Sequence, residues 1–148
     1  MAGCDPWAIR VALADQIRDY VSADINVYPH GMRNPDNPSI QVVAAAEHIA
    51  YIGTMGANGV GDMMLELLVS TSSQDDESEM RLLCELLSAG TGYESSLFDA
   101  VHSDRTLGGV VTDAVVLAAN DVVEGDPEAP ASVRVPVQII FTKVSANV

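Results

Sequence analysis

The histidines and cysteines are the side chains of this sequence best suited to binding a metal. His30, His48 and His102 lie far apart, without the HxxxH or HxH spacing that brings two imidazoles to one ion. Cys4 and Cys84 are the only cysteines, and they stand alone at distant positions. The sequence therefore predicts no zinc site. It predicts two free thiols, which suit a reducing cytoplasm.

Two further kinds of catalytic chemistry find little support. A serine hydrolase needs a nucleophile on a sharp turn, and the GxSxG pattern is absent. The stretch "AVHSDR" contains Ser, His and Asp, but such triads are assembled by folding and rarely from neighbours in sequence. The glycine-rich "GTMGANGVG" lacks the lysine and the following helix of a phosphate loop, so it predicts a hairpin turn.

Clustered carboxylates leave one enzymatic alternative open. "QDDESE", residues 74–79, could bind a divalent cation, although its place at a predicted helix start indicates helix capping instead. "NDVVEGDPE", residues 120–128, carries four carboxylates around a glycine but lacks the ligand spacing of an EF-hand. A divalent-metal-dependent hydrolase using Asp75, Asp76, Asp121 or Asp126 remains the alternative from a different functional class.

Composition narrows the possible partners. The chain has 148 residues, 48% of them hydrophobic, and 21 acidic against 7 basic residues give a net charge of −14. Such charge argues against binding to DNA phosphates or to anionic membranes. The first residues lack the basic segment followed by an apolar segment that is typical of a signal peptide. No apolar run approaches the roughly 20 residues of a membrane helix. We expect one soluble intracellular domain, residues 1–148.

Three segments have the spacing of helices. Asp5 and Pro6 begin a helix over 6–21. Ser72 or Ser73 caps a second helix that ends near residue 89 before Gly90. A short third helix covers 95–102 and buries Leu97, Phe98 and Val101. In the second helix the apolar stripe comprises Met80, Leu83, Cys84 and Leu87, widened by Leu82 and Leu86.

The remaining apolar segments indicate strands. We predict strands at 24–29, from residue 39, at 62–72, at 110–118 and at 133–144, with long loops over 31–39 and 119–132. The 62–72 strand is expected to be covered on both faces. Pro136 removes a hydrogen-bond donor, so the last strand is expected to be an edge strand or bulged.

This order of elements predicts an α+β fold, a mainly antiparallel sheet with helices packed on one face. The 6–21 and 74–89 helices should cover the sheet. The residues expected to be buried are Leu13, Ile17, Leu83, Leu87, Val115, Val137 and Ile139.

The corner "SDRTLGG", residues 103–109, connects the short third helix to a valine-rich strand. Asp104 can accept from backbone amides of the turn, and Arg105 can pair with Asp104 or cap the helix. Leu107 can anchor the turn in the core, and Gly108 and Gly109 let the chain reverse. The glycines precede a strand and not a helix, which argues against a phosphate site.

A helix, a "DRTLGG" corner, an Asp-containing valine-rich strand and a final strand resemble the tail-terminator, or tail-completion, proteins of long-tailed bacteriophages, particularly those of actinobacterial hosts. The resemblance extends over "NVYPHGMRNPDNPSIQVV", "SSQDDESEMRLLCELL" and "SLFDAVHSDRTLGGVVTDAVV". Residues 118–132 depart from it, because relatives tend to have a hairpin with glycine and aromatic residues there.

The resemblance implies a structural virion protein and no enzyme. Such proteins form a ring, commonly a homohexamer, on the head-proximal end of the tail tube, where they stop tube polymerisation. The implied partners are the major tail tube protein and a head-tail connector or stopper protein, with the genome passing through the lumen without sequence-specific binding. The implied location is the virion neck, after assembly in the host cytoplasm. No catalytic residue, cofactor, metal site or membrane contact is expected. Another neck component, a head-closure or head-to-tail joining protein, is the alternative within this class.

Overall fold

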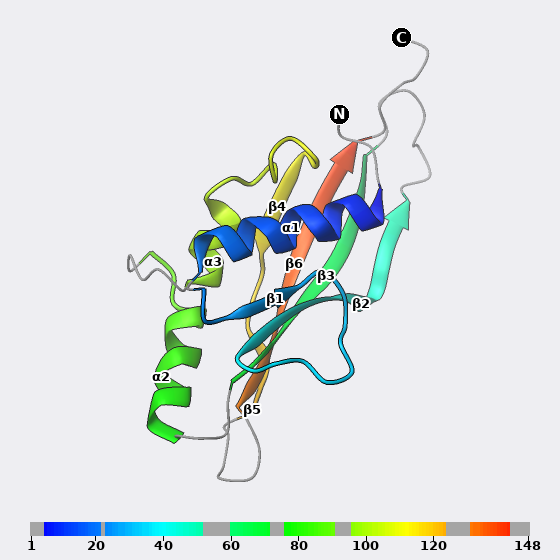
Figure 1. Ribbon diagram of the computed structural model, residues 1–148. Coiled ribbons are helices and arrows are strands. Elements are labelled where there is room, and N and C mark those ends of the chain that lie inside the picture. Colours follow the sequence, from blue (N-terminus) through cyan, green and yellow to red (C-terminus); the bar gives the residue numbers. More distant parts are fainter. Residues whose placement is uncertain are drawn as a thin grey trace.

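The protein has the predicted α+β fold, a curled, mainly antiparallel sheet with helices on one face (Figure 1). A computed structural model describes residues 5–21, 23–51, 60–71, 76–90, 96–123 and 131–142. In chain order, the elements are α1 (Pro6–Tyr20), β1 (Asn26–Tyr28), β2 (Ser39–Tyr51), β3 (Val60–Ser70), α2 (Asp76–Leu87), α3 (Leu97–His102), β4 (Asp113–Val116), β5 (Asn120–Val123) and β6 (Ser132–Thr142).

The sheet places its last strand in the middle. The order is β1-β2-β3-β6-β4, and β5 pairs with β6 beyond the end of β4. Only the β1–β2 pair is parallel among the described strands. In the central strands β3 and β6, alternate side chains point into the core, as the sequence pattern predicted. The inward side chains of the two central strands are Met63, Leu65, Leu67 and Val69 of β3 with Val133, Val135, Val137, Ile139 and Phe141 of β6.

Helix α1 crosses the buried face of the sheet (Figure 1). The Asp5 carboxylate accepts a hydrogen bond from the Ala8 amide at 3.2 Å, and Pro6 occupies the first turn. Its buried side chains, Leu13 and Ile17 among them as predicted, pack into the core. The predicted 6–21 helix is confirmed to within one residue at its end.

Helix α2 corrects two predictions. Leu83 is buried as predicted, but its buried neighbour is Leu86, whereas Leu87 is half-buried and the thiol of Cys84 is exposed. The stripe predicted from the sequence included Cys84 on its buried face. Helix α2 packs chiefly against α3 and not across the sheet, so a different face, with Leu83 and Leu86, is buried. The sheet is instead covered by α1 and α3. The predicted caps Ser72 and Ser73 lie outside the described residues.

Strands β4 and β5 correct two more predictions. Val115 is half-buried, and the buried residue of β4 is Ala114, because the pleat directs neighbouring side chains to opposite faces. The predicted 119–132 loop contains strand β5, all four residues of which are exposed. Because none of them is buried, β5 has no alternation of apolar and polar residues that would predict a strand. Its two register pairs with β6 also have an irregularity between them.

Pro136 lies inside a central strand, so the prediction of an edge or bulged strand was wrong. It pairs in register with Glu66 of β3, and its carbonyl accepts from the Leu117 amide at 3.0 Å. In a strand, a residue's N–H and C=O point toward the same neighbour. The missing donor of Pro136 therefore faces the junction between β4 and β5, and the β3–β6 ladder loses nothing.

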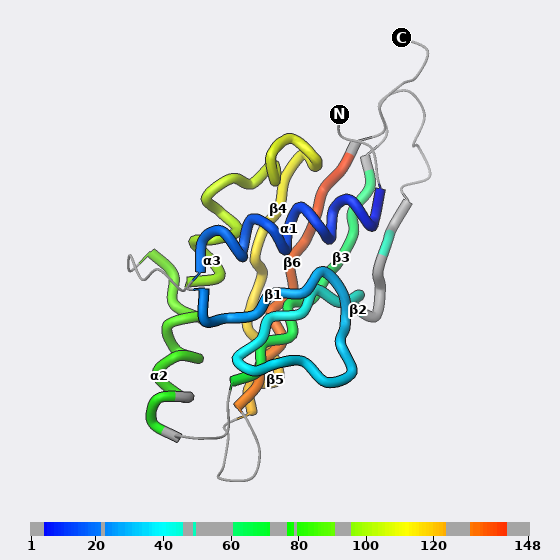
Figure 2. The backbone as a smooth tube through the Cα atoms, in the orientation of Figure 1, coloured from blue at the N-terminus to red at the C-terminus, as the bar shows by residue number. Residues whose placement is uncertain are grey.

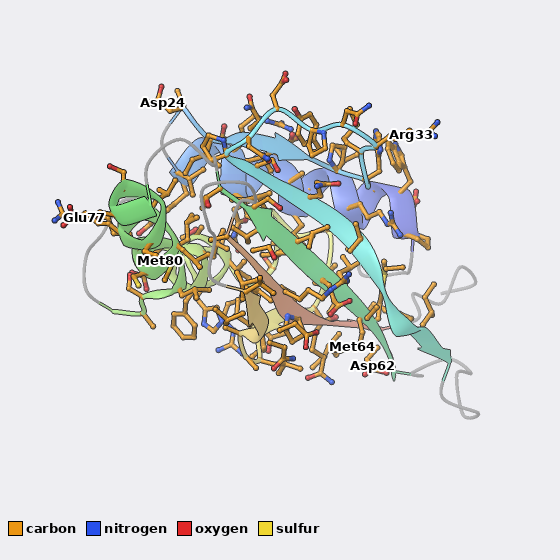
Figure 3. All side chains as sticks on the ribbon, turned by 90° about the horizontal axis from the view of Figure 1, so that it is seen from below. Asp24, Arg33, Asp62, Met64, Glu77 and Met80 are labelled. Carbon is orange, nitrogen blue, oxygen red and sulfur yellow. The ribbon has the colours of Figure 1, made fainter. Side chains whose placement is uncertain are left out.

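The second face of the sheet carries half-buried side chains, not the full cover predicted for the third strand. Met64, Glu66 and Leu68 of β3 are each half-buried. Figure 3 shows Asp62 and Met64 on the side of the sheet away from α1. Arg134 of β6 lies 3.4 Å from Glu66 across the same face. No described helix covers this face.

The predicted loop after β1 is confirmed over residues 29–38, and Figure 2 shows its path from β1 to β2. Hydrogen bonds attach this loop to the sheet. Asn26 Nδ2 donates to the Asp36 carbonyl at 2.8 Å, and the Asp36 amide donates to the Tyr28 hydroxyl at 3.3 Å. The Met32 amide donates to Gln41 Oε1 at 2.7 Å. These bonds give residues 32–36 a defined position beside β1 and β2.

Candidate functional site

The corner between α3 and β4 is organised by one carboxylate. Asp104 Oδ1 accepts from the Thr106 amide at 3.0 Å and its hydroxyl at 2.6 Å, and Oδ2 accepts from the Gly108 amide at 2.9 Å. The Thr106 hydroxyl contributes most, followed by the Gly108 and Thr106 amides, to lowering the pKa of Asp104 below its ordinary 3.8. The predicted role of Asp104 as acceptor for the turn is confirmed.

Arg105 binds a different partner from the two predicted. Its Nε and a terminal nitrogen lie 2.7 Å from the two carboxylate oxygens of Asp113, the first residue of β4. This is a two-pronged ion pair with favourable geometry. The Asp104 carboxylate accepts instead from the amides and the hydroxyl of its own turn. The corner and the strand that follows are thus joined by their side chains.

Leu107 anchors the corner, as predicted. Its side chain is 3% exposed although its φ is +50°, a conformation that is uncommon for residues with a side chain. Gly108 and Gly109 follow at +72° and +90°. The Thr106 carbonyl accepts from the amides of Gly109 and Val111, which closes the reversal. Burial of one apolar side chain therefore holds a left-handed run of backbone in place.

Gln16 of α1 connects the corner to the first helix. Its Nε2 lies 2.9 Å from the Ala100 carbonyl and 3.0 Å from those of Val101 and Asp104. The carbonyls of Ala100 and Val101 belong to the last turn of α3, where backbone donors run out, and that of Asp104 belongs to the corner. Sequence reasoning did not single out Gln16, because a glutamine beside an apolar stripe has the same pattern as one facing solvent.

His102 is a structural residue of this corner. Its Nε2 accepts from the Val116 amide at 3.2 Å, and its ring stacks on Phe98 with centroids 4.0 Å apart. Burial is the main cause that lowers its pKa below 6.5, and the nearby Arg105 adds to the effect. Ser103 donates to the Ala100 carbonyl at 2.7 Å. The Ser, His and Asp of "AVHSDR" therefore each have separate local partners.

The other candidate residues do not converge in the described part of the chain. His30 is exposed and stacks on Trp7 with centroids 6.2 Å apart. Asp121 is an exposed residue of β5 with φ +54°. Among the described residues, no three histidines, cysteines or carboxylates lie together as metal ligands would. Asp75, Asp126 and the side chains of Asp76 and His48 lie outside the described residues, as does the "GTMGANGVG" turn except its last two residues, which begin β3.

Two hollows mark the described surface, and the larger lies beside the corner. The larger, about 420 Å³, is an open groove between α1 and the corner. It has apolar walls and an acidic rim, and its lining residues are Ala12, Asp15, Gln16, Asp19, Tyr20, Ser103, Asp104, Leu107 and Gly108. We call it the α1–corner groove. The smaller, about 230 Å³, is apolar and lies where the end of α2 meets α3 and the β4–β5 connection.

Comparison with known proteins adds no family assignment. No protein-family model matches the sequence, and no curated protein matches it either. Within the described residues, no helix combines the length and apolar character needed to cross a membrane.

Proposed function

We propose that this protein is a tail-terminator protein, a ring-forming virion component that ends polymerisation of a phage tail tube and joins the tail to the head. The observation that carries the proposal is the corner at 103–109 together with the strand after it. The "DRTLGG" residues and the aspartate of the following valine-rich strand are the part of the sequence that resembles this family most specifically.

The geometry of the corner supports this comparison, because it gives each of these residues a structural task. Asp104 organises the turn, Leu107 anchors it, and Arg105 is paired with Asp113 at 2.7 Å. These residues thus act together as one structural unit. Such a unit suits a protein whose task is to present a defined surface to neighbouring subunits.

The charge of the chain supports the proposal in a second way. At −14 per copy, a ring of this protein would repel the phosphates of DNA passing through its lumen. An acidic lumen would therefore let the genome pass without adhering.

The test is tube termination. The proposal expects a tube-protein gene close to this one. Its product would be polymerised alone and with the purified protein, and tube lengths would be measured by negative-stain electron microscopy. We expect shorter tubes that carry a ring at one end. Rings that bind a connector but leave tube length unchanged would identify another neck component. Hydrolysis that depends on added Mg²⁺ would contradict the proposal and favour the enzyme.

A further inference from the structure

Helix α1 exposes two unlike flanks. At 100° per residue, Trp7 and Arg18 lie on one flank, whereas Gln16 and Asp19 lie on the other. Contacts agree with this geometry. Trp7 stacks on His30 and Arg18 donates to the Val27 carbonyl at 2.7 Å, while Gln16 donates into α3. One flank therefore faces β1 and its loop, and the other faces the corner.

The first flank carries exposed apolar surface beside a cation. Trp7 is 56% exposed and Met32 is 37% exposed, and His30 stacks on the indole. Arg33 is exposed, and it pairs with no carboxylate within the described part of the chain. Figure 3 shows Arg33 directed outward at the end of the molecule where α1 begins. We call Trp7, His30, Met32 and Arg33 the aromatic–basic patch.

The aromatic–basic patch has a defined shape before any partner binds. Met32 is held by the 2.7 Å bond to Gln41, and Trp7 belongs to the first turn of α1. A fixed surface loses less conformational entropy on binding than a loose one. Trp and Arg are also the residues that contribute most to protein interfaces. The patch therefore has the composition of a docking surface.

The α1–corner groove has the complementary chemistry. Its apolar side chains include Ala12 and Tyr20, and its rim carries Asp19 and Asp104. Asp19 is exposed and forms no ion pair among the described residues. An aromatic surface with a cation at its edge fits an apolar groove with carboxylates at its edge.

We propose that the aromatic–basic patch of one copy docks into the α1–corner groove of a second copy, with Arg33 facing Asp19. Because the two surfaces lie on opposite flanks of α1, the contact is head-to-tail and leaves one of each surface free to continue the assembly. The contact between copies does not depend on the proposed function. Only its closure into a ring rests on that function. Asp5 and Asp36 lie near the patch in sequence, and the chain carries a net charge of −14. The attraction between Arg33 and Asp19 must therefore act at short range, against an overall repulsion between copies.

Charge reversal on each surface tests the contact. Arg33→Glu places a carboxylate on the patch opposite Asp19, and Asp19→Arg places a cation on the rim of the groove opposite Arg33. Each variant should self-associate at least about tenfold more weakly than the wild type in sedimentation velocity at 0.15 M salt, because like charges then meet. Circular dichroism would check that each variant is folded.

Mixing the two variants is the decisive measurement. In an equimolar mixture, the carboxylate introduced by Arg33→Glu meets the cation introduced by Asp19→Arg, and the unchanged Arg33 and Asp19 also match. Association should therefore return toward the wild-type level. Arg81→Glu is the control, because it changes the net charge as Arg33→Glu does but lies on the exposed part of α2. Trp7→Ala should weaken association about thirtyfold, the effect of losing a central tryptophan.

The outcomes separate this inference from the proposed function. Rings that form equally well in Arg33→Glu, Asp19→Arg and Arg81→Glu would overturn the contact while leaving a terminator ring standing. Rescue by mixing, in open chains that never shorten tail tubes, would support the contact and contradict the terminator function. Failure of the mixture to associate better than either variant alone, or a wild type that stays monomeric throughout, would overturn the contact.

Discussion

At the scale of single residues, the titration of Asp104 is linked to folding. Hydrogen bonds to its ionised carboxylate lower its pKa below 3.8, so this contribution to stability is present above 3.8 and is lost as the pH falls through the lower pKa of the folded state. We expect Asp104→Asn to be less stable than the wild type at pH 7. The difference should narrow below pH 3.8, measured by urea unfolding at several pH values.

Thr106→Val is the companion variant for this experiment. It keeps the Asp104 carboxylate but removes the hydroxyl that donates to Asp104 Oδ1 at 2.6 Å, the largest cause of the lowered pKa. It should therefore change the pH dependence of unfolding in the same direction as Asp104→Asn, and by less. An Asp104→Asn variant with the same pH profile as the wild type would show that the carboxylate does not organise the corner.

Gln16 supports a second prediction at this scale. Replacing Gln16 by alanine removes the amide donor that the carbonyls of Ala100, Val101 and Asp104 share, while the Ser103 hydroxyl still donates to Ala100 and the Leu107 amide to Asp104. Because Gln16 is half-buried, we expect Gln16→Ala to lower the free energy of unfolding by about 0.5–1.5 kcal/mol, the net contribution of an ordinary hydrogen bond. Gln16→Glu, of nearly the same shape, should be at least as unstable at neutral pH because its carboxylate would face these carbonyls. Equal stability of Gln16→Glu and the wild type would refute the role of the amide.

At the scale of elements, α2 allows a test of which helix face is buried. Leu83 is 1% exposed, so Leu83→Ala should lower the free energy of unfolding by about 2–5 kcal/mol. The neighbouring Cys84 is exposed, and Cys84→Ala should change stability by less than about 0.5 kcal/mol. Thermal and urea unfolding of the two variants would measure this difference. Similar losses for both would show that α2 packs through the face first predicted from sequence.

Sequence patterns predicted the buried faces of the most regular elements. Regular alternation in β6 and helical spacing in α1 predicted their buried faces, because one face of each element packs against a continuous core. The α+β fold and the turn chemistry of Asp104, Leu107 and the two glycines followed from similar local rules.

Other features depend on neighbours that a sequence pattern does not reveal. Strand β5 has no buried face, so it carries no alternation. Pro136 is accommodated only because its missing donor faces the β4–β5 junction. Arg105 pairs with Asp113 because the chain reversal of the corner brings the start of β4 beside it. In each case the contact that decides the outcome joins two different elements, and a pattern within one element does not show which other element it will meet.

At the scale of the whole molecule, net charge should control assembly. Six copies would bring about −84 (6 × −14) into one ring, so long-range repulsion opposes association. Salt reduces the range of this repulsion to about 10 Å at 0.1 M, while close, partly buried pairs are screened less. We expect monomers in dilute buffer and assembly as NaCl or Mg²⁺ is added, followed by light scattering. Assemblies that are stable at low ionic strength and dissociate on adding salt would show that attraction between charges dominates.

The central position of β6 has a consequence for how the molecule comes into being. The ribosome makes β6 after every other described strand, yet β6 joins β3 to β4 and β5. Until it emerges, β3 presents an unpaired edge and the apolar faces of β3 and β4 have no common core. The nascent chain must therefore wait for its last strand before the sheet can close, and the exposed edge of β3 is then the part of the chain most open to pairing with another newborn copy.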